Sequence, residues 1–121
     1  MSAKRMLEEA SWAIVGSHGR NPICDRLHTT LIRGQKQVFR VNPGVATDEV
    51  FPSLTAIGKH VDVVNLVINP TKGPAVVEEM VRLGIKYLWI QPGAESQQVI
   101  SLAESKGIQV HKGCVLVEAK F

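Results

Sequence analysis

The chain has 121 residues, of which 45% are hydrophobic and 21% charged, and its formal charge is +3. These values are typical of an ordinary globular protein with one core, so residues 1–121 are expected to form a single domain. The basic residues are scattered rather than interleaved with aromatic side chains, which excludes a nucleic-acid-binding surface. No apolar run approaches the roughly 20 residues of a membrane-spanning helix, so no membrane-spanning segment and no membrane partner are expected.

The two cysteines, Cys24 and Cys114, lie far apart in the sequence. They form neither a disulfide framework nor a zinc-binding pattern. Residues 1–10 include Glu8 and Glu9 and resemble neither a secretory signal nor a transit peptide. Together these features predict a cytoplasmic protein.

Short apolar runs and amphipathic stretches alternate along the chain. The stretch Ser2–Ser11 predicts a leading helix. Five strands are expected near residues 12–16, 37–42, 62–68, 86–90 and 108–111. Three helices with an apolar stripe are expected between them: one from Asn21-Pro22 to Gly34, one over Ala75–Leu83 and one over Glu95–Lys106. The pattern does not place the tail, residues 113–121.

Continuous apolar strands that alternate with amphipathic helices predict a parallel sheet covered on both faces. Right-handed crossovers leave few topologies for such a sheet. The expected fold class is α/β, a Rossmann-like doubly wound parallel sheet of five strands in three layers (α/β/α), with strand order 3-2-1-4-5.

The first strand leads into a polar, glycine-containing loop, and the rest of the fold is organised around this junction. Four apolar residues, Trp12 to Val15, run into the loop Gly16–Arg20. Asn21 is a good N-cap, and Pro22 suits the first helical position. Such a strand-loop-helix unit directs backbone N–H groups and the positive end of a helix dipole at one point, which favours a phosphate. The alternative is a plain turn in which glycine only relieves crowding.

Three other strands also end in short polar loops. In a doubly wound sheet ligands bind outside the carboxyl ends of the strands, so these loops are expected to share one rim. Arg20, Arg40 and Lys72 are cations near that rim. The residues predicted to bind a nucleotide-type ligand there are Gly16, Ser17, His18, Gly19, Arg20, Asn21, Asn42, Pro43, Ile68, Asn69, Pro70, Lys72, Gln91, Pro92 and Gly93.

Two well-known nucleotide motifs are missing. A dinucleotide site needs a third glycine after Gly16 and Gly19, and an acidic residue at the end of the second strand, where Asn42-Pro43 stands. The sequence therefore disfavours NAD. It also has no P-loop pattern. No group of residues predicts a metal site or a catalytic acid–base pair.

The chain resembles the small CoA-binding proteins, whose domain is similar to the N-terminal domain of the succinyl-CoA synthetase alpha subunit. The resemblance extends from Trp12 to Glu118 and implies a Rossmann-like domain that binds CoA. The residues on which the resemblance rests are Ala13–Ser17 with Asn21-Pro22, Val41–Pro43, Val61–Val64 followed by Pro70, Pro74 and Val77–Glu79, then Gly84–Lys86, Trp89–Gly93, Gly107-Ile108 and Cys114. Two departures are Gly44–Ala46, where some relatives carry a lysine that pairs with phosphate, and Lys112-Gly113 before Cys114, where Asp-Arg is usual.

Several reactive side chains have two interpretations each. Cys24 is a thiol with a lowered pKa or a packed side chain, and Cys114 is a reactive thiol or a buried structural one. His18 either touches a phosphate or is a solvated loop residue. Surface or packing roles are expected for the other ionisable candidates, with Asp62 capping a turn; these are His28, His60, His111, Asp62, Glu78 and Glu79.

Three functions fit these features. The first is a lone binding module for CoA or an acyl-CoA. The second is a small acyl-CoA- or NAD(P)-linked enzyme that uses Cys24, His18 or Cys114. The third is an interaction protein with a vestigial nucleotide site, as a homodimer or with an unidentified protein partner.

For the first function, the phosphates of CoA are expected against Gly16–Asn21 and the start of the next helix. The adenosine is expected near Asn42-Pro43 and Ile68–Pro70, and the pantetheine arm past Gln91–Gly93 across the switch in strand order. Phe51-Pro52 is expected to border this rim or a dimer contact, and Trp89 to be buried.

Overall fold

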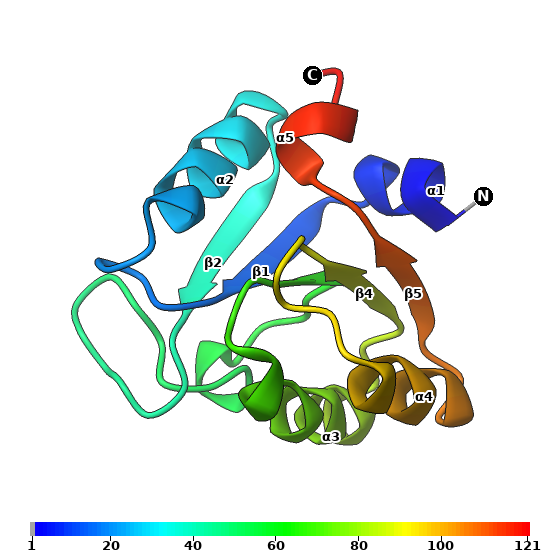
Figure 1. Cartoon of the computed structure of the whole chain (residues 1–121). Helices are drawn as coiled ribbons and strands as arrows, with labels where there is room; N and C mark the ends of the chain where they lie inside the picture. The colour runs from blue at the N-terminus through cyan, green and yellow to red at the C-terminus, as the bar shows by residue number, and fades with distance from the viewer. Residues whose placement is uncertain (1) are drawn as a thin grey trace.

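A computed structural model describes residues 2–121, in which a five-stranded parallel sheet lies between two layers of helices (Figure 1). The strands are β1 (Ser11–Val15), β2 (Gln37–Val41), β3 (Val63–Leu66), β4 (Tyr87–Ile90) and β5 (Gln109–Lys112). The α-helices are α1 (Ser2–Glu8), α2 (Pro22–Arg33), α3 (Gly73–Leu83), α4 (Gln97–Ser105) and α5 (Val115–Glu118). Two 3-10 turns lie in the connections, η1 (Thr55–Ile57) and η2 (Pro70–Lys72).

The α/β class, the parallel sheet and the strand positions are confirmed, while some helix ends differ from the prediction. The leading helix stops at Glu8, because Ser11 already opens β1. Helix α4 starts after Ser96, whose hydroxyl accepts a hydrogen bond from the Val99 N–H at 3.1 Å. The tail forms the short helix α5. In the part of the chain that is described, no helix is both long and apolar enough to cross a bilayer.

The predicted strand order, 3-2-1-4-5, is wrong: the observed order is β2-β1-β3-β4-β5. The predicted order placed β3 at an edge of the sheet. All four residues of β3 are fully buried, so this strand has neighbours on both sides, β1 and β4. The edge position goes instead to β2, which carries the exposed Gln37 and the half-buried Arg40.

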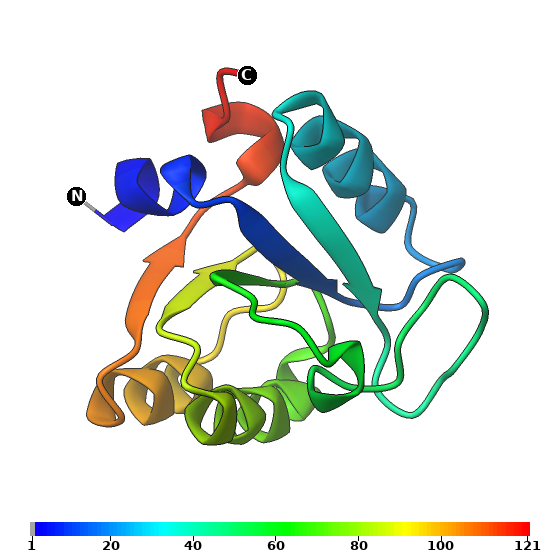
Figure 2. The same ribbon diagram turned by 180° about the vertical axis from the view of Figure 1, so that it is seen from behind.

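The two faces of the sheet bury separate cores. Side chains at alternate strand positions, such as Trp12, Ile14 and Trp89, pack against α1, α2 and α5. The other set packs against α3 and α4, together with η1 and the chain around it. Figure 2 shows the same arrangement from behind, with α3 and α4 on one face and α1, α2 and α5 on the other. Trp89 is fully buried, as predicted.

The connection between β2 and β3 is held to the sheet at Phe51. This residue forms an isolated parallel bridge with Val41, and its N–H donates to the Arg40 carbonyl at 2.8 Å. Its carbonyl accepts from the Asn42 N–H at 3.0 Å. Phe51-Pro52 therefore borders the rim loop after β2, which was one of its two predicted positions; the dimer contact stays a prediction.

Glu79 corrects the expectation of a solvated helix face on α3. Its carboxylate accepts hydrogen bonds from the N–H groups of Leu54 and Thr55 and from the Thr55 hydroxyl, at 2.6–3.1 Å. Its neighbour Glu78 is exposed, as expected. Asp62 was expected to cap a turn; its carboxylate instead accepts from the N–H and hydroxyl of Ser11, 51 residues away in the sequence, at the amino ends of β1 and β3.

Candidate functional site

The corrected strand order moves the place where a ligand is expected. The connection after β1 and the connection after β3 run over opposite faces of the sheet, because α2 covers one face and α3 the other. The crevice of a doubly wound sheet opens between two such strands, at their carboxyl ends. For the observed strand order a ligand is therefore expected between the loop after β1 and the loop after β3, and not beside β4 as the predicted order implied.

The loop between β1 and α2, residues 16–21, closes on itself but leaves two donors free. The N–H groups of Arg20 and Asn21 both donate to the Ser17 carbonyl, at 3.0 and 2.9 Å. The N–H groups of Ser17 and Gly19 find no acceptor among residues 2–121. Gly19 has φ +88°, a conformation that glycine adopts without strain, and no atom lies within 4 Å of a Cβ built there. The loop therefore offers two amide donors and open space.

The first turn of α2 offers fewer donors than the sequence led us to expect. Asn21 is the predicted N-cap, and its Oδ1 accepts from the Ile23 N–H at 3.1 Å. Pro22 has no N–H, and the Cys24 N–H donates to the Asn21 carbonyl at 3.0 Å. The early helix donors are already paired, so this end of α2 contributes its dipole rather than further hydrogen bonds.

The loop between β3 and α3 follows the strand next to β1 and also leaves backbone donors free. The Val67 N–H donates to the Val15 carbonyl at 2.8 Å, which ties the start of this loop to the end of β1. The N–H groups of Ile68 and Asn69 have no acceptor in the described chain. The Asn69 side chain caps η2 by accepting from the Thr71 N–H and hydroxyl, both at 2.9 Å. Ile68 as a whole residue is only 2% exposed, whereas Asn69 is exposed, so Asn69 offers the accessible donor of this pair.

The loop after β2 is already hydrogen-bonded. The Asn42 N–H donates to Phe51 and the Gly44 N–H to Pro52, so this loop, with Pro43 at its centre, is held by the chain that returns toward β3. This loop can form a wall of the site, but few of its backbone N–H groups are free to donate to a ligand.

The loop after β4 lies one strand beyond the crevice. The Gln91 side chain is 2% exposed, and its Oε1 accepts from the Val115 N–H at 2.9 Å. Gln91 thus holds the start of α5. Pro92 and Gly93 are exposed, and the Gly93 N–H donates to Glu95 at 2.7 Å. The Gln91 N–H donates to the Leu66 carbonyl at 3.0 Å, so Gln91–Gly93 lie next to the loop after β3, and their contact with a ligand stays a prediction.

Gly16 is a packing residue. A Cβ built on it would lie 2.7 Å from the Cys24 Sγ and 3.2 Å from the Val67 Cβ. Its own N–H donates to the Val41 carbonyl at 2.9 Å, so it has no donor for a ligand. The close approach of α2 and the β3 loop requires glycine here, and this explains the glycine at the end of β1.

His18 is anchored to the sheet. Its Nε2 donates to the Ile14 carbonyl at 2.8 Å, and Nδ1 is buried with no partner among the described residues. Burial lowers the pKa of the ring, which is therefore neutral at pH 7. His18 adds no positive charge to the rim. The exposed Arg20 and Lys72 are the cations on the two crevice loops, while Arg40 lies 3.6 Å from Asp25.

The cysteines do not form a reactive pair with a base. Cys24 is fully buried, and burial raises the pKa of its thiol to about 11, so the packing interpretation is confirmed for it. Cys114 is half-buried rather than buried, with its Sγ 3.5 Å from the Gln91 Nε2. His111 bonds Glu118 at 2.9 Å and His60 bonds Asp62 at 2.8 Å. Among residues 2–121, no group of three potential ligands is arranged for a metal ion.

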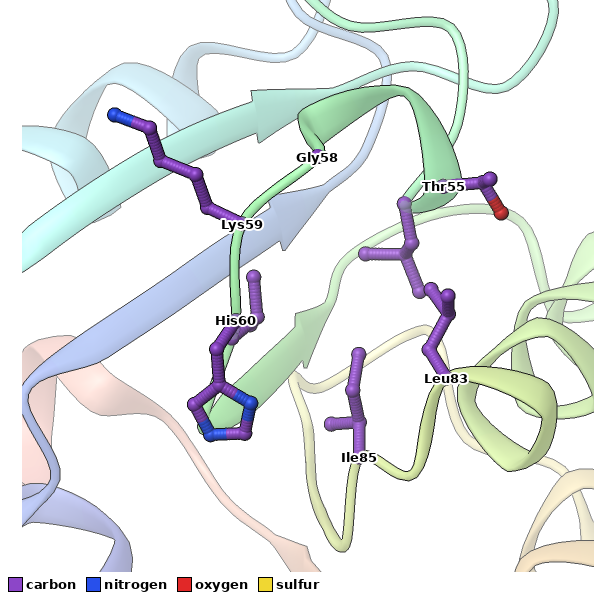
Figure 3. Close-up of a pocket in the computed structure, with 8 residues that line it drawn as sticks. Thr55, Gly58, Lys59, His60, Leu83 and Ile85 are labelled. Atoms are coloured by element: carbon purple, nitrogen blue, oxygen red, sulfur yellow. The ribbon is translucent and has the colours of Figure 1, made fainter.

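Two of the cavities lie at opposite ends of the sheet strands. One, of about 500 Å³, lies between the β1–α2 loop and the turn 47–50. The other, of about 250 Å³, lies near the amino ends of β3 and β4. In Figure 3 Lys59 and His60 extend away from Leu83 and Ile85 around this second cavity, so its polar groups do not converge. The first cavity is at the ligand rim.

The turn 47–50 was not predicted as part of the site. It brings Asp48 and Glu49 to the same cavity as Gly19. The dinucleotide motif has its acidic residue where β2 ends, and Asp48 and Glu49 lie further along the connection. The free amides were also missed, because which N–H groups stay unpaired depends on how each turn closes.

Comparison with known proteins identifies a family. A family profile described as a CoA binding domain matches residues 10–120. The chain belongs to this CoA-binding domain family. A search of curated proteins finds no match.

Several solved structures share this fold. A conserved hypothetical protein from Pyrococcus furiosus is 30% identical, with a TM-score of 0.78 and coverage of 92% of this chain and 100% of the other. A hypothetical protein from Pyrococcus horikoshii OT3 is 22% identical, with a TM-score of 0.81 and coverage of 92% and 82%. A protein from Thermus thermophilus is 21% identical, with a TM-score of 0.81 and coverage of 96% and 92%.

Proposed function

We propose that this chain is a binding module for CoA or an acyl-CoA, with the diphosphate of the ligand in the crevice between the β1 and β3 loops. The observation that carries the proposal is the set of unpartnered N–H groups at Ser17, Gly19 and Asn69, which are not buried and lie on the loops after β1 and β3. Family membership supplies the ligand class.

Backbone donors of this kind suit a diphosphate. An N–H group that stays unpaired is energetically costly unless water or a ligand accepts its hydrogen bond, and phosphate oxygens are strong acceptors. The dipole of α2 adds positive potential at the same point. The exposed Arg20 and Lys72 add net charge without a fixed geometry. Such a site binds an anion mainly through its backbone.

The raised pKa of Cys24 argues against an enzyme that uses this thiol as its nucleophile. Two of the histidines are also engaged. His18 donates to the Ile14 carbonyl, and His111 bonds Glu118. The proposal therefore assigns the residues around the crevice to binding.

A matched pair of substitutions tests the proposal. Ser17→Asp places a carboxylate beside a free amide, and Ser17→Asn has nearly the same shape without the charge. A carboxylate about 5 Å from a diphosphate in a partly solvated site weakens binding by roughly tenfold or more at low ionic strength. We expect calorimetry to show CoA binding to the native chain and to Ser17→Asn, and binding at least tenfold weaker to Ser17→Asp.

ATP and NADP serve as comparison ligands in the same titrations, and circular dichroism checks the fold of each variant. No heat of binding with CoA or acetyl-CoA at millimolar concentration would show that the proposed ligand is wrong. Equal affinity in the two variants would leave CoA as the ligand but remove its phosphates from this loop.

A further inference from the structure

The cavity beside the β1–α2 loop contains more negative than positive charge. Its charged lining residues are Arg40 and three carboxylates, on Asp25, Asp48 and Glu49. Arg40 lies 3.6 Å from Asp25, and these two charges offset each other. Asp48 and Glu49 are exposed and have no cationic partner within 4.0 Å in the part of the chain described.

The turn that carries these two carboxylates has a defined structure. The N–H of Thr47 donates to the Val50 carbonyl at 3.0 Å, and the Thr47 hydroxyl accepts from the Glu49 N–H at 3.3 Å. The bridge between Val41 and Phe51 fixes the end of the turn to β2. In both ribbon views the loop that contains this turn lies beside the β1–α2 loop (Figures 1 and 2). The turn that carries the carboxylates is therefore held beside the cavity that Gly19 also lines.

The position of the cavity matches one part of a nucleotide. In doubly wound sheets whose first loop holds a diphosphate, the ribose of the adenosine lies toward the end of the second strand, where an acidic side chain accepts hydrogen bonds from its hydroxyls. Here β2 lies next to β1, and the turn 47–50 follows β2. A ribose attached to a diphosphate at Ser17 and Gly19 would come close to Asp48 and Glu49.

We propose that Asp48 and Glu49 make the site selective for an adenosine 5′-diphosphate group whose ribose carries free hydroxyls, so that dephospho-CoA binds more tightly than CoA. This inference rests on the proposed function, because it concerns the same crevice. Free ribose hydroxyls donate hydrogen bonds to carboxylates. A 3′-phosphate at the same place carries no such donor at neutral pH and is repelled by both charges.

Calorimetry with four ligands tests the preference: CoA, dephospho-CoA, ADP and adenosine 3′-phosphate 5′-diphosphate. The last two reproduce the difference at the ribose without the pantetheine arm. We expect dephospho-CoA to bind at least tenfold more tightly than CoA at low ionic strength, with a smaller ratio at 0.5 M salt because exposed charges are screened. NAD, whose adenosine ribose is also unphosphorylated, shows whether the pantetheine arm is needed.

The double variant Asp48→Asn/Glu49→Gln identifies the cause. It should reduce the preference for dephospho-CoA to less than threefold, mainly because CoA binds more tightly. The matched control is Glu78→Gln/Glu104→Gln, which changes the net charge by the same amount at exposed positions on α3 and α4. The control should keep the preference of the native chain.

The outcomes separate the two proposals. If neither CoA nor dephospho-CoA binds, the proposed function fails and this inference with it. If CoA binds as tightly as dephospho-CoA, the function stands and the selectivity is refuted. If the preference survives in Asp48→Asn/Glu49→Gln, or disappears in the control, the assignment to this turn is refuted.

Discussion

Replacing Gly16 by alanine tests whether this residue is required for packing, as the structure indicates. The new Cβ would lie 2.7 Å from the Cys24 Sγ and 3.2 Å from the Val67 Cβ. Overpacking of this kind costs about 1–3 kcal/mol. Gly16 has no positive φ, so alanine fits the backbone and recovers about 0.4–1 kcal/mol from the unfolded state. The expected net loss in the free energy of unfolding is about 1–2 kcal/mol.

A double-mutant cycle with Cys24→Ala isolates the shorter contact. Cys24→Ala removes the sulfur that the new Cβ would meet and costs about 1 kcal/mol by itself through the lost packing. In that background Gly16→Ala should be nearly neutral, because only the 3.2 Å contact with Val67 remains. The loss in the free energy of unfolding of the double variant should therefore be about 1 kcal/mol smaller than the sum of the two single losses.

Urea unfolding followed by circular dichroism measures all four proteins. The reasoning is refuted if Gly16→Ala is as stable as the native chain, or if its cost is the same with and without the sulfur. Calorimetry on the folded Gly16→Ala variant adds a second readout. Since the Gly16 N–H already donates to Val41, the affinity for CoA should change by less than about threefold.

The strands were predictable because each is a short apolar run between turn residues. Their order was not, because neighbouring strands are chosen by burial in three dimensions. One signal did exist: Gln37 and Arg40 interrupt the second run, whereas residues 63–66 contain only Asn65 as a polar residue. An interrupted run favours the edge of a sheet, and an apolar run favours its centre.

The site was predictable as a set of loops but not as a set of donors. The glycines, prolines and asparagines at four strand ends indicated a rim, and the first loop was identified through Asn21-Pro22. Which amides remain free depends on contacts between distant segments, such as the Val67 N–H with the Val15 carbonyl. Glu79 was misassigned for the same reason, since its partners lie 24 and 25 residues away in the sequence.

Two further predictions concern groups whose partners only the structure identifies. Burial opposes the charge of Glu79, but hydrogen bonds from Thr55 and Leu54 outweigh it and hold the carboxyl pKa below its usual value. Glu79→Gln should therefore lose about 1 kcal/mol of stability at pH 7, and this difference should disappear as the pH falls through the lowered pKa in urea titrations. The opposite sign is expected at Asn65, which is fully buried in β3 while neither its Oδ1 nor its Nδ2 has a partner among the described residues. A buried polar group without partners costs about 1–3 kcal/mol, and an apolar side chain of similar shape removes that cost. Asn65→Leu should therefore raise the free energy of unfolding by about 1 kcal/mol, whereas Asn65→Ala, which leaves a cavity, should not. A loss of stability in Asn65→Leu would show that the amide of Asn65 has a partner that stabilises the native chain, such as a buried water.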